Sequence, residues 1–324
     1  MIRSIRPTTA TPHSIFLRIL RTMATVDKVT LPHIERTAAE PRDNRLHPVI
    51  LSQVSQVNSS IRLLRLSPVG KEAIKFQPGQ WIDLHIPSLP SPGGFTLTST
   101  PTTSTSYLEL AIQRPPSPSP SKTTSTSNST PRTPAHWLWQ PPSQILNSTL
   151  GIRVGGSFTW PPPLQSIKRV VFIAGGVGIN PLMSMLSDIA EDREKAPNGK
   201  LGFKIVFLYS VRNSIDENGR SEEILFLSRL REIFGSLGEE GMFRLFLTGQ
   251  KGEEAGLGEG AEGLQVRKRR IGESDVEDAL GEVAERDGTV VYVCGVPGMT
   301  DRFVELVGKA EGMDEKRVLS EKWW

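Results

Sequence analysis

The chain has very little cysteine: Cys294 is the only one in 324 residues. A single thiol excludes an internal disulfide and an iron–sulfur cluster held by cysteines, and it favours a reducing compartment. No apolar run reaches about 18 residues, so no membrane span is predicted. The five histidines show no metal-ligand spacing, so no metal site is predicted. The formal net charge of +3 is too small to indicate nucleic-acid binding.

Acidic residues are absent from positions 1–26, where four arginines stand among serines and threonines. A basic, acid-free segment of this kind is typical of a mitochondrial transit peptide, which predicts a location in the mitochondrial matrix. A disordered basic tail is the alternative. Translation from Met23 would remove the signal and leave a cytoplasmic protein. Residues 27–46 are polar and aperiodic, which predicts a linker.

The segment 47–166 is predicted to be a small antiparallel β-barrel or sandwich, because short β runs alternate with glycine and proline. The expected strands cover 49–57, 61–66, 80–86, 94–98, 107–113 and 151–154. Residues 115–134 interrupt them with proline, serine and threonine and contain almost no apolar side chain. Such a segment cannot bury enough surface to become ordered, so a disordered surface insertion is predicted.

From residue 167 to 324 the pattern changes to alternating strands and helices. Strands are expected at 169–174, 204–209, 243–248 and 289–294, helices at 180–193, 221–234, 274–286 and 298–309, and an extended end at 317–324. Alternation of this kind predicts a parallel sheet with helices on both faces, interrupted by a flexible Gly/Glu-rich insertion at 251–266. The predicted fold class is a two-domain α+β protein: an antiparallel barrel followed by a parallel α/β domain.

The strand at 169–174 runs into three glycines, Gly175, Gly176 and Gly178, and then into a helix with Pro181 in its first turn. Glycines at such a junction let a ligand approach the backbone, and the first N–H groups of the helix can bind a phosphate. The segment therefore predicts nucleotide binding. A plain connector between strand and helix is the alternative.

Two later strand ends add to this prediction. After the second strand, Ser210 and Arg212 stand where a dinucleotide fold approaches the adenosine ribose, and the lack of an acid there weakly favours NADPH; a solvated arginine is the alternative. Cys294 ends the fourth strand, where its small side chain could touch a nicotinamide, although a buried structural cysteine is equally compatible. The terminal Trp323 and Trp324 are expected to pack on a flavin, a core or a partner.

Together these motifs resemble those of the ferredoxin–NADP reductase superfamily, over residues 47–324. The resemblance implies a flavin-binding barrel, a pyridine-nucleotide domain, and the cofactors FAD and NAD(P)H. Hydride would pass from nicotinamide to flavin, beside Cys294 and Trp324, and then to an unknown electron acceptor. The cofactor-binding residues that it implies are Phe95, Thr96, Leu97, Thr98, Gly175, Gly176, Val177, Gly178, Ile179, Asn180, Pro181, Ser210, Arg212, Cys294, Gly295, Pro297, Met299 and Trp323.

The flavin half departs from the superfamily pattern. Gly93 stands where the family has an arginine that binds the flavin pyrophosphate, and Gly155–Phe158 replaces a second flavin-contacting loop. Arg114 is a candidate to compensate, and a return of turnover in Gly93→Arg would locate the defect at position 93. The departure leaves two alternatives to a flavoenzyme. One is an NAD(P)-binding sensor or assembly module without tight FAD binding, and the other is a reductase that works without flavin.

Overall fold

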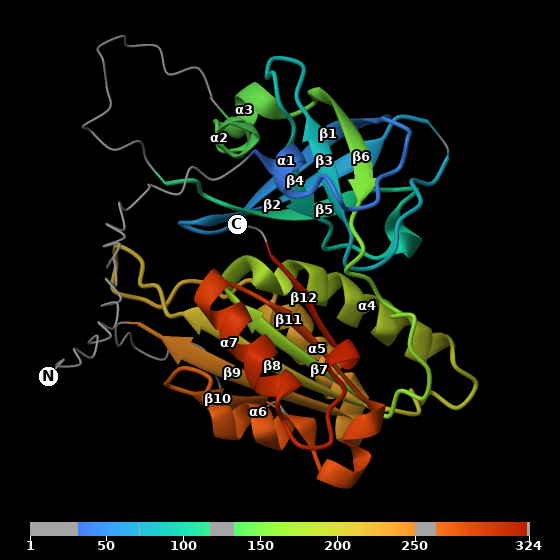
Figure 1. Ribbon diagram of the computed structural model, residues 1–324. Coiled ribbons are helices and arrows are strands. Elements are labelled where there is room, and N and C mark those ends of the chain that lie inside the picture. The colour runs from blue at the N-terminus through green and yellow to red at the C-terminus, as the bar shows by residue number, and fades with distance from the viewer. Residues whose placement is uncertain (1–31, 71, 117–132, 250–263, 323–324) are drawn as a thin grey trace, which may run out of the picture. The chain divides into compact units, whose positions relative to one another are not determined.

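The computed structural model describes residues 32–70, 72–116, 133–249 and 264–322. An antiparallel six-stranded sheet comes first along the chain, and a parallel six-stranded sheet flanked by helices follows it (Figure 1). The predicted fold class is confirmed. The predicted transit peptide, most of the insertion at 115–134 and most of the insertion at 251–266 lie outside the described residues.

The first sheet is a barrel. Its strands are β1 (His47–Asn58), β2 (Ile61–Pro68), β3 (Trp81–His85), β4 (Gly93–Thr96), β5 (Leu108–Gln113) and β6 (Thr149–Gly155), in the order β4-β3-β6-β1-β2-β5. A bridge between Leu97 and Leu110 joins the two edges. Two short helices, α2 (Pro134–Leu138) and α3 (Pro142–Ile145), add apolar side chains to the core.

The second sheet has the strands β7 (Arg169–Gly175), β8 (Lys204–Arg212), β9 (Gly241–Thr248), β10 (Leu264–Arg267), β11 (Thr289–Cys294) and β12 (Val318–Glu321). Their order is β10-β9-β8-β7-β11-β12, so the chain changes direction between β7 and β11. Helices α4 (Ile179–Lys195) and α5 (Leu227–Leu237) cover one face, and α6 (Glu273–Leu280) and α7 (Pro297–Gly308) cover the other. In such sheets ligands bind at the carboxyl ends of the strands flanking the change of direction.

Three elements differ most from the predictions. Helix α5 begins at Leu227 rather than 221, because Ser221 pairs with Ile215 and Phe226 has a positive φ of 61°. Helix α6 ends before Gly281, whose φ of +78° stops it. Strand β10 lies partly inside the predicted flexible insertion at 251–266, where its four residues pair with β9.

The predicted linker at 27–46 is wrong for its described part. Residues His33–Arg36 form helix α1, and the imidazole of His33 is only 8% exposed. This segment packs through polar contacts rather than an apolar stripe, so its hydropathy pattern gave no sign of order.

Polar contacts connect the barrel to helices α4 and α5 of the parallel domain. The side-chain amide of Asn180 donates to the Ala111 carbonyl at 3.0 Å, and the Ser184 hydroxyl donates to the Ser99 carbonyl at 2.7 Å. Arg229 on α5 forms an ion pair at 3.0 Å with Glu109 of the barrel, which is 3% exposed. Within the described residues, no helix is long and apolar enough to cross a membrane.

Candidate functional site

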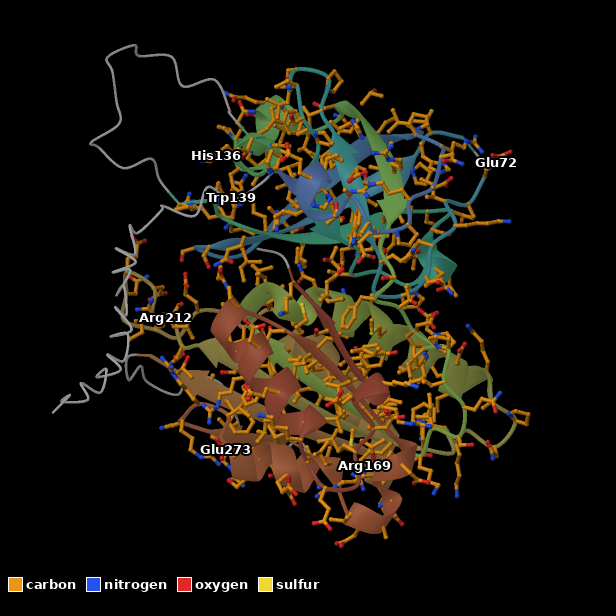
Figure 2. The ribbon with its side chains drawn as sticks, viewed as in Figure 1. Glu72, His136, Trp139, Arg169, Arg212 and Glu273 are labelled. Atoms are coloured by element: carbon orange, nitrogen blue, oxygen red, sulfur yellow. The ribbon has the colours of Figure 1, made fainter. Side chains whose placement is uncertain are left out.

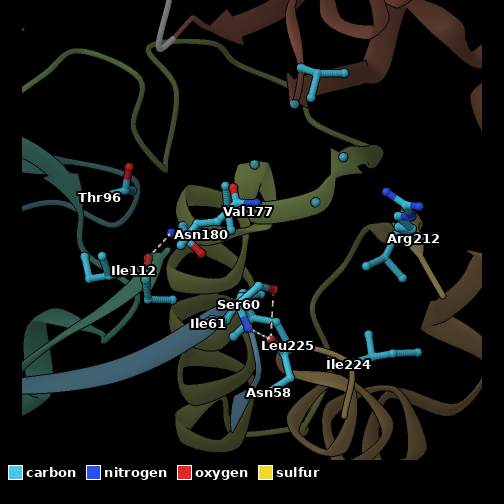
Figure 3. A pocket seen from close by; sticks show the side chains of 18 of the residues that line it. Asn58, Ser60, Ile61, Thr96, Ile112, Val177, Asn180, Arg212, Ile224 and Leu225 are labelled. Atoms are coloured by element: carbon cyan, nitrogen blue, oxygen red, sulfur yellow. Dashed lines mark hydrogen bonds between the residues drawn. The ribbon is translucent and has the colours of Figure 1, made fainter. Parts of the chain in front are cut away.

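A cavity of about 710 Å³ lies between the barrel and the carboxyl ends of the parallel strands. Drug-sized ligands and cofactors occupy cavities of roughly this size, about 300–1,000 Å³. Figure 3 shows Thr96 and Arg212 on opposite sides of Val177, in the loop after β7, and Asn180, in the first turn of α4. Arg212 ends β8 near the barrel, whereas Arg169 begins β7 at the far end of the same sheet (Figure 2).

Gly176 is the glycine that offers bare backbone to this cavity. Its φ is +55°, and an added Cβ would meet nothing within 4 Å. It begins a short 3-10 turn (Gly176–Gly178) that leads into the 17-residue helix α4. The unpaired N–H groups at the start of such a helix favour an anion, and an open glycine allows it to come close.

Gly175 and Gly178 have a different role from the one predicted. A Cβ on Gly178 would lie 2.4 Å from the Cys294 carbonyl oxygen and 2.6 Å from Gly295 Cα. A Cβ on Gly175 would lie 2.6 Å from the Met299 sulfur. These glycines allow the loops after β7 and β11 to touch each other. Met299 fills the space beside them instead of facing the cavity.

The end of β8 contributes three residues to the cavity. Tyr209, Val211 and Arg212 line it, whereas Ser210 does not. The Tyr209 hydroxyl has no hydrogen-bond partner in the described chain, and burial raises the pKa of this phenol. Tyr209 therefore stays a neutral hydroxyl that can donate to a ligand.

Sequence reasoning missed the residues that close the cavity beside β8. The turn between β1 and β2 meets the loop before α5: Ser59 N–H donates to Glu222 at 2.8 Å, and the Asn58 amide donates to the Glu223 carbonyl at 2.9 Å. The turn sequence predicts a hairpin and gives no sign of this partner, which lies more than 160 positions away.

On the barrel side, two of the four predicted flavin residues line the cavity. Phe95 and Thr96 of β4 do so, and their ring and hydroxyl suit stacking and hydrogen bonding. Leu97 belongs to the barrel core. Thr98 is fully buried and donates its hydroxyl to Glu109 at 3.0 Å. These two residues support the strand end rather than the cavity.

The departures from the family pattern have packing explanations. A Cβ on Gly93 would lie 2.8 Å from Pro134 Cβ and 2.9 Å from the Phe95 ring, so an arginine there would collide with α2. This packing argues against a rescue of flavin binding by Gly93→Arg. Arg114 does not line the cavity, because its guanidinium stacks 4.7 Å from the Trp139 ring centre.

The altered loop at 155–158 packs inward as well. Cβ atoms on Gly155 and Gly156 would lie 2.6 Å from atoms of the Trp81 indole. Ser157 binds Glu40 through its N–H at 3.0 Å and through its hydroxyl at 2.7 Å. None of these residues lines the cavity. The loop is adapted to Trp81 and to the segment before β1.

Cys294 lies in the sheet with no exposed surface, and its side chain does not line the cavity. Burial, with a smaller contribution from Glu321, raises the pKa of its thiol, so the thiolate is not available at neutral pH. The neighbouring Gly295, Val296 and Pro297 line the cavity instead. The predicted contact between this thiol and a nicotinamide is not made by the side chain as it lies here.

The predicted site residues therefore fall into three groups. Lining the cavity are Phe95, Thr96, Gly175, Gly176, Val177, Gly178, Asn180, Arg212, Gly295 and Pro297. Packed around it without lining it are Leu97, Thr98, Ile179, Pro181, Ser210, Cys294 and Met299. Trp323 and Trp324 lie outside the described residues.

Several buried polar atoms around the cavity lack partners in the described chain: Asn180 Oδ1, Tyr209 Oη and Glu222 Oε2. Buried polar groups of this kind normally have hydrogen bonds, so they mark places where a polar ligand would bind. A dinucleotide offers hydroxyls, amides and phosphates for them. The residues present thus fit a nicotinamide dinucleotide at the parallel sheet and a flavin at β4. Among the described residues, no cluster of histidine, cysteine and carboxylate side chains could hold a metal ion.

The comparisons with known proteins agree with this geometry. Residues 172–305 match the family model "Oxidoreductase NAD-binding domain". The chain is 28% identical over 297 residues to human oxidoreductase NAD-binding domain-containing protein 1, covering 90% of this chain and 84% of that protein. The resemblance to ferredoxin reductase-like proteins is confirmed.

Solved structures share the fold. The cytochrome P450 reductase GcoB from Amycolatopsis superposes with a TM-score of 0.60 at 19% identity, covering 87% of this chain and 70% of that one. The flavohemoglobin from Malassezia yamatoensis, solved with bound FAD and heme, gives 0.59 at 15% identity, covering 89% and 62%. At these identities the likeness establishes the fold alone, a barrel followed by a parallel α/β domain.

Proposed function

We propose that the protein is an FAD-dependent NAD(P)H oxidoreductase. The observation that carries the proposal is that one cavity is lined both by the barrel strand β4 and by the glycine loop after β7. Two cofactors bound on these two sides would meet in one space. The bound FAD of the flavohemoglobin with the same fold supports the flavin assignment.

The bound cofactors would supply hydride transfer from the nicotinamide to the flavin, and the chain would position them. Phe95 and Thr96 would hold the flavin side. The Gly176 backbone and the start of α4 would hold the nucleotide phosphates, and Tyr209 would donate a hydrogen bond. Hydride transfer needs no acid or base from the protein, so the neutral, buried Cys294 and Tyr209 are compatible with this role.

The proposal is tested by reconstitution. The purified full-length chain is mixed with FAD, freed of unbound flavin by gel filtration, and examined for absorption between the near ultraviolet and the blue. NADH or NADPH is then added with an artificial electron acceptor. We expect retained flavin absorption and flavin-dependent nucleotide oxidation. A colourless protein with no turnover would contradict the proposal.

A second function is favoured by one observation, the blocked position at Gly93. An NAD(P)-binding sensor or assembly module would need only the parallel-sheet side of the cavity. It predicts binding of NADH or NADPH by calorimetry in a chain that binds no FAD and oxidises no nucleotide. Retained flavin with turnover would dismiss this alternative. A flavin-independent reductase would instead oxidise nucleotide with no flavin bound.

Arg212→Ala tests the choice between the two nucleotides. Arg212 lines the cavity at the end of β8. A guanidinium at this position suits a 2′-phosphate, so we expect NADPH affinity to fall roughly tenfold and NADH affinity to change little. Calorimetric titration of both nucleotides measures the difference. Equal losses would show that Arg212 does not read the 2′-phosphate.

The acceptor of the electrons and the mitochondrial location stay predictions. The targeting segment lies outside the described residues.

A further inference from the structure

Helix α1 lies directly against the flavin-side strand β4. A Cβ on Gly94 would come within 2.1 Å of the His33 imidazole, so this glycine makes room for the helix. His33 also meets the Trp81 indole edge-on, with ring centres 4.9 Å apart. His33 Nε2 is 2.9 Å from Asp83 Oδ1 on the neighbouring strand β3. The helix is therefore fixed where the predicted flavin strand enters the cavity.

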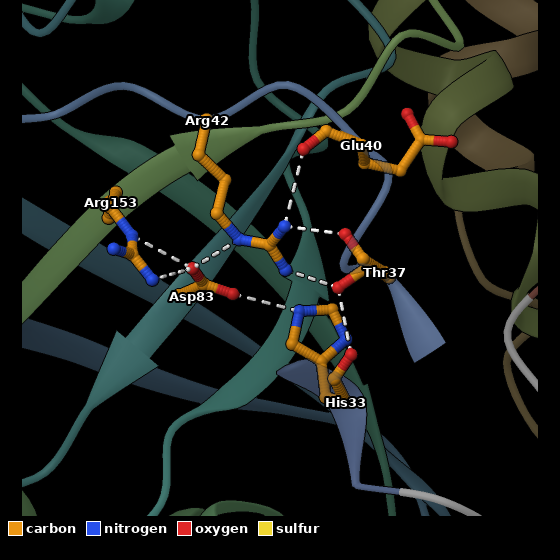
Figure 4. A network of polar contacts seen from close by, with 6 residues as sticks. All are labelled: His33, Thr37, Glu40, Arg42, Asp83 and Arg153. Atoms are coloured by element: carbon orange, nitrogen blue, oxygen red, sulfur yellow. Dashed lines mark hydrogen bonds and ion pairs between the residues drawn. The ribbon is translucent and has the colours of Figure 1, made fainter. Parts of the chain in front are cut away.

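A second attachment holds the chain just after this helix (Figure 4). Arg42 Nε donates to Asp83 Oδ2 at 3.0 Å, and another Arg42 nitrogen donates to the Thr37 carbonyl at 2.5 Å. The same carboxylate thus holds the segment on both sides of Arg36. A side chain on a segment held at two points loses less entropy when it binds a ligand than one on a free tail.

Arg36 extends from this helix to the cavity and lines it together with Gly94, Phe95 and Thr96. Its Nε is buried and has no hydrogen-bond partner in the described chain. Burial lowers the pKa of its guanidinium, as expected for a cation placed without a matching anion. An arginine remains charged in such a place, so the barrel side of the cavity carries a cation that forms no ion pair with a described residue.

The alternatives for a cation on this side are few. Position 93 is filled by the close approach of Pro134 and Phe95. Arg62 and Arg114 both stack on the Trp139 ring, at 4.4 and 4.7 Å. The one other arginine among the described lining residues is Arg212, on the parallel-sheet side.

We propose that Arg36 binds the pyrophosphate of FAD and takes the place of the arginine that the family has at position 93. The proposal rests on the FAD-binding function proposed above. At neutral pH the flavin ring, the ribityl chain and the adenosine carry no charge, so the pyrophosphate is the part of FAD that an unpaired guanidinium recognises. The cation enters the site from the segment before the barrel, whereas the family pattern places it on the β4 motif itself.

Arg36→Gln in the full-length chain tests the proposal. FAD and riboflavin are each titrated with the protein, and binding is followed by flavin fluorescence. Riboflavin has the same ring as FAD and no phosphate. Loss of a charge-assisted contact should weaken FAD binding by roughly ten- to a hundredfold and leave riboflavin affinity unchanged. Added sodium chloride should weaken FAD binding to the unmodified protein more than to the variant. Arg36→Lys should retain part of the affinity.

Arg114→Gln is the matched control, because it removes a nearby arginine that stacks on Trp139 outside the cavity. It should leave FAD affinity unchanged, and thermal unfolding should show both variants folded. FAD affinity unaltered in Arg36→Gln, or an equal loss for riboflavin, would overturn the role of Arg36 while leaving the flavoenzyme in place. A weakening of NADPH binding with FAD binding unchanged would overturn it as well. No FAD binding by the unmodified protein would overturn both proposals.

Discussion

Replacing Gly178 with valine is expected to abolish nucleotide binding by separating the two loops that form the floor of the cavity. The new Cβ would lie 2.4 Å from the Cys294 carbonyl oxygen, and that oxygen belongs to the backbone of a central strand. Neither side can move as a flexible side chain would. We expect a loss of about 3 kcal/mol in the free energy of unfolding, at the upper end of overpacking. NADH and NADPH affinity should fall by at least about a hundredfold.

Two alanine variants distinguish separation of the two loops from a block to the approach of the ligand. Gly176 and Gly199 have φ values of +55° and +60°, and a Cβ on either would meet nothing within 4 Å. Both variants should therefore lose a similar, small free energy of unfolding, about 1–2 kcal/mol, from the left-handed backbone. Only Gly176→Ala places a methyl group at the cavity, so it alone should weaken nucleotide binding. Calorimetry and chemical denaturation of the three variants give both quantities.

Nucleotide affinity preserved in a folded Gly178→Val chain would refute the role given to the two touching loops. Loss of affinity in Gly199→Ala would show that the measurement reports general destabilisation. From the sequence, Gly178 is expected to let the ligand approach the backbone. In the structure that role applies to Gly176.

The fold could be predicted because its signals are local. The β-branched runs that form β7 and β11 are buried on both faces, so they have no polar alternation and are read as parallel strands. The glycines that follow them correctly predict a cavity at the carboxyl ends of the strands. Strand β10 has only four residues, two of them polar, and stands beside a Gly/Glu-rich stretch. Its pairing with β9 could not be recognised from hydropathy.

The candidate site could be predicted only in part, because contacts across the chain decide the rest. Ser210 and Arg212 have similar local surroundings in sequence, yet only Arg212 lines the cavity. Arg36 stands in a polar segment without periodicity, which indicates a linker. What orders that segment is the carboxylate of Asp83, fifty positions from His33. No local pattern connects these residues.

Asp83→Asn is expected to release this segment from the barrel. Asp83 has no exposed surface and binds His33, Arg42 and Arg153, the last with its two nitrogens at 3.0 and 2.8 Å. An asparagine would leave two arginines facing a neutral group. Removing one partner of a buried ionic cluster costs about 3–5 kcal/mol, and we expect the lower figure because Arg153 is partly exposed. FAD affinity should fall together with the free energy of unfolding, because α1 carries Arg36.

The loss of stability in Asp83→Asn should depend on pH, and its direction follows from the pKa of Asp83. Burial alone would raise the pKa of Asp83, but the hydrogen bonds from His33, Arg153 and Arg42 outweigh it and lower this pKa to about 2. A carboxyl with a lowered pKa stabilises the folded state above its ordinary value of 3.8, and this contribution disappears as the pH falls toward 2. The difference between the two values corresponds to about 2 kcal/mol. The gap in unfolding free energy between the wild-type chain and Asp83→Asn should therefore narrow between about pH 4 and pH 2.

Glu72→Gln is the control for a carboxylate in an ion pair at the surface. Glu72 and its partner Arg45 are 79% and 64% exposed in their side chains, so its loss should cost less than about 1 kcal/mol. Denaturant unfolding at several pH values measures the gap, and limited trypsin digestion near Arg36 and Arg42 reports release of the segment. If Asp83→Asn matched Glu72→Gln in stability and protease resistance, the carboxylate would not be what holds α1. Arg36 would then need another support to reach the cavity.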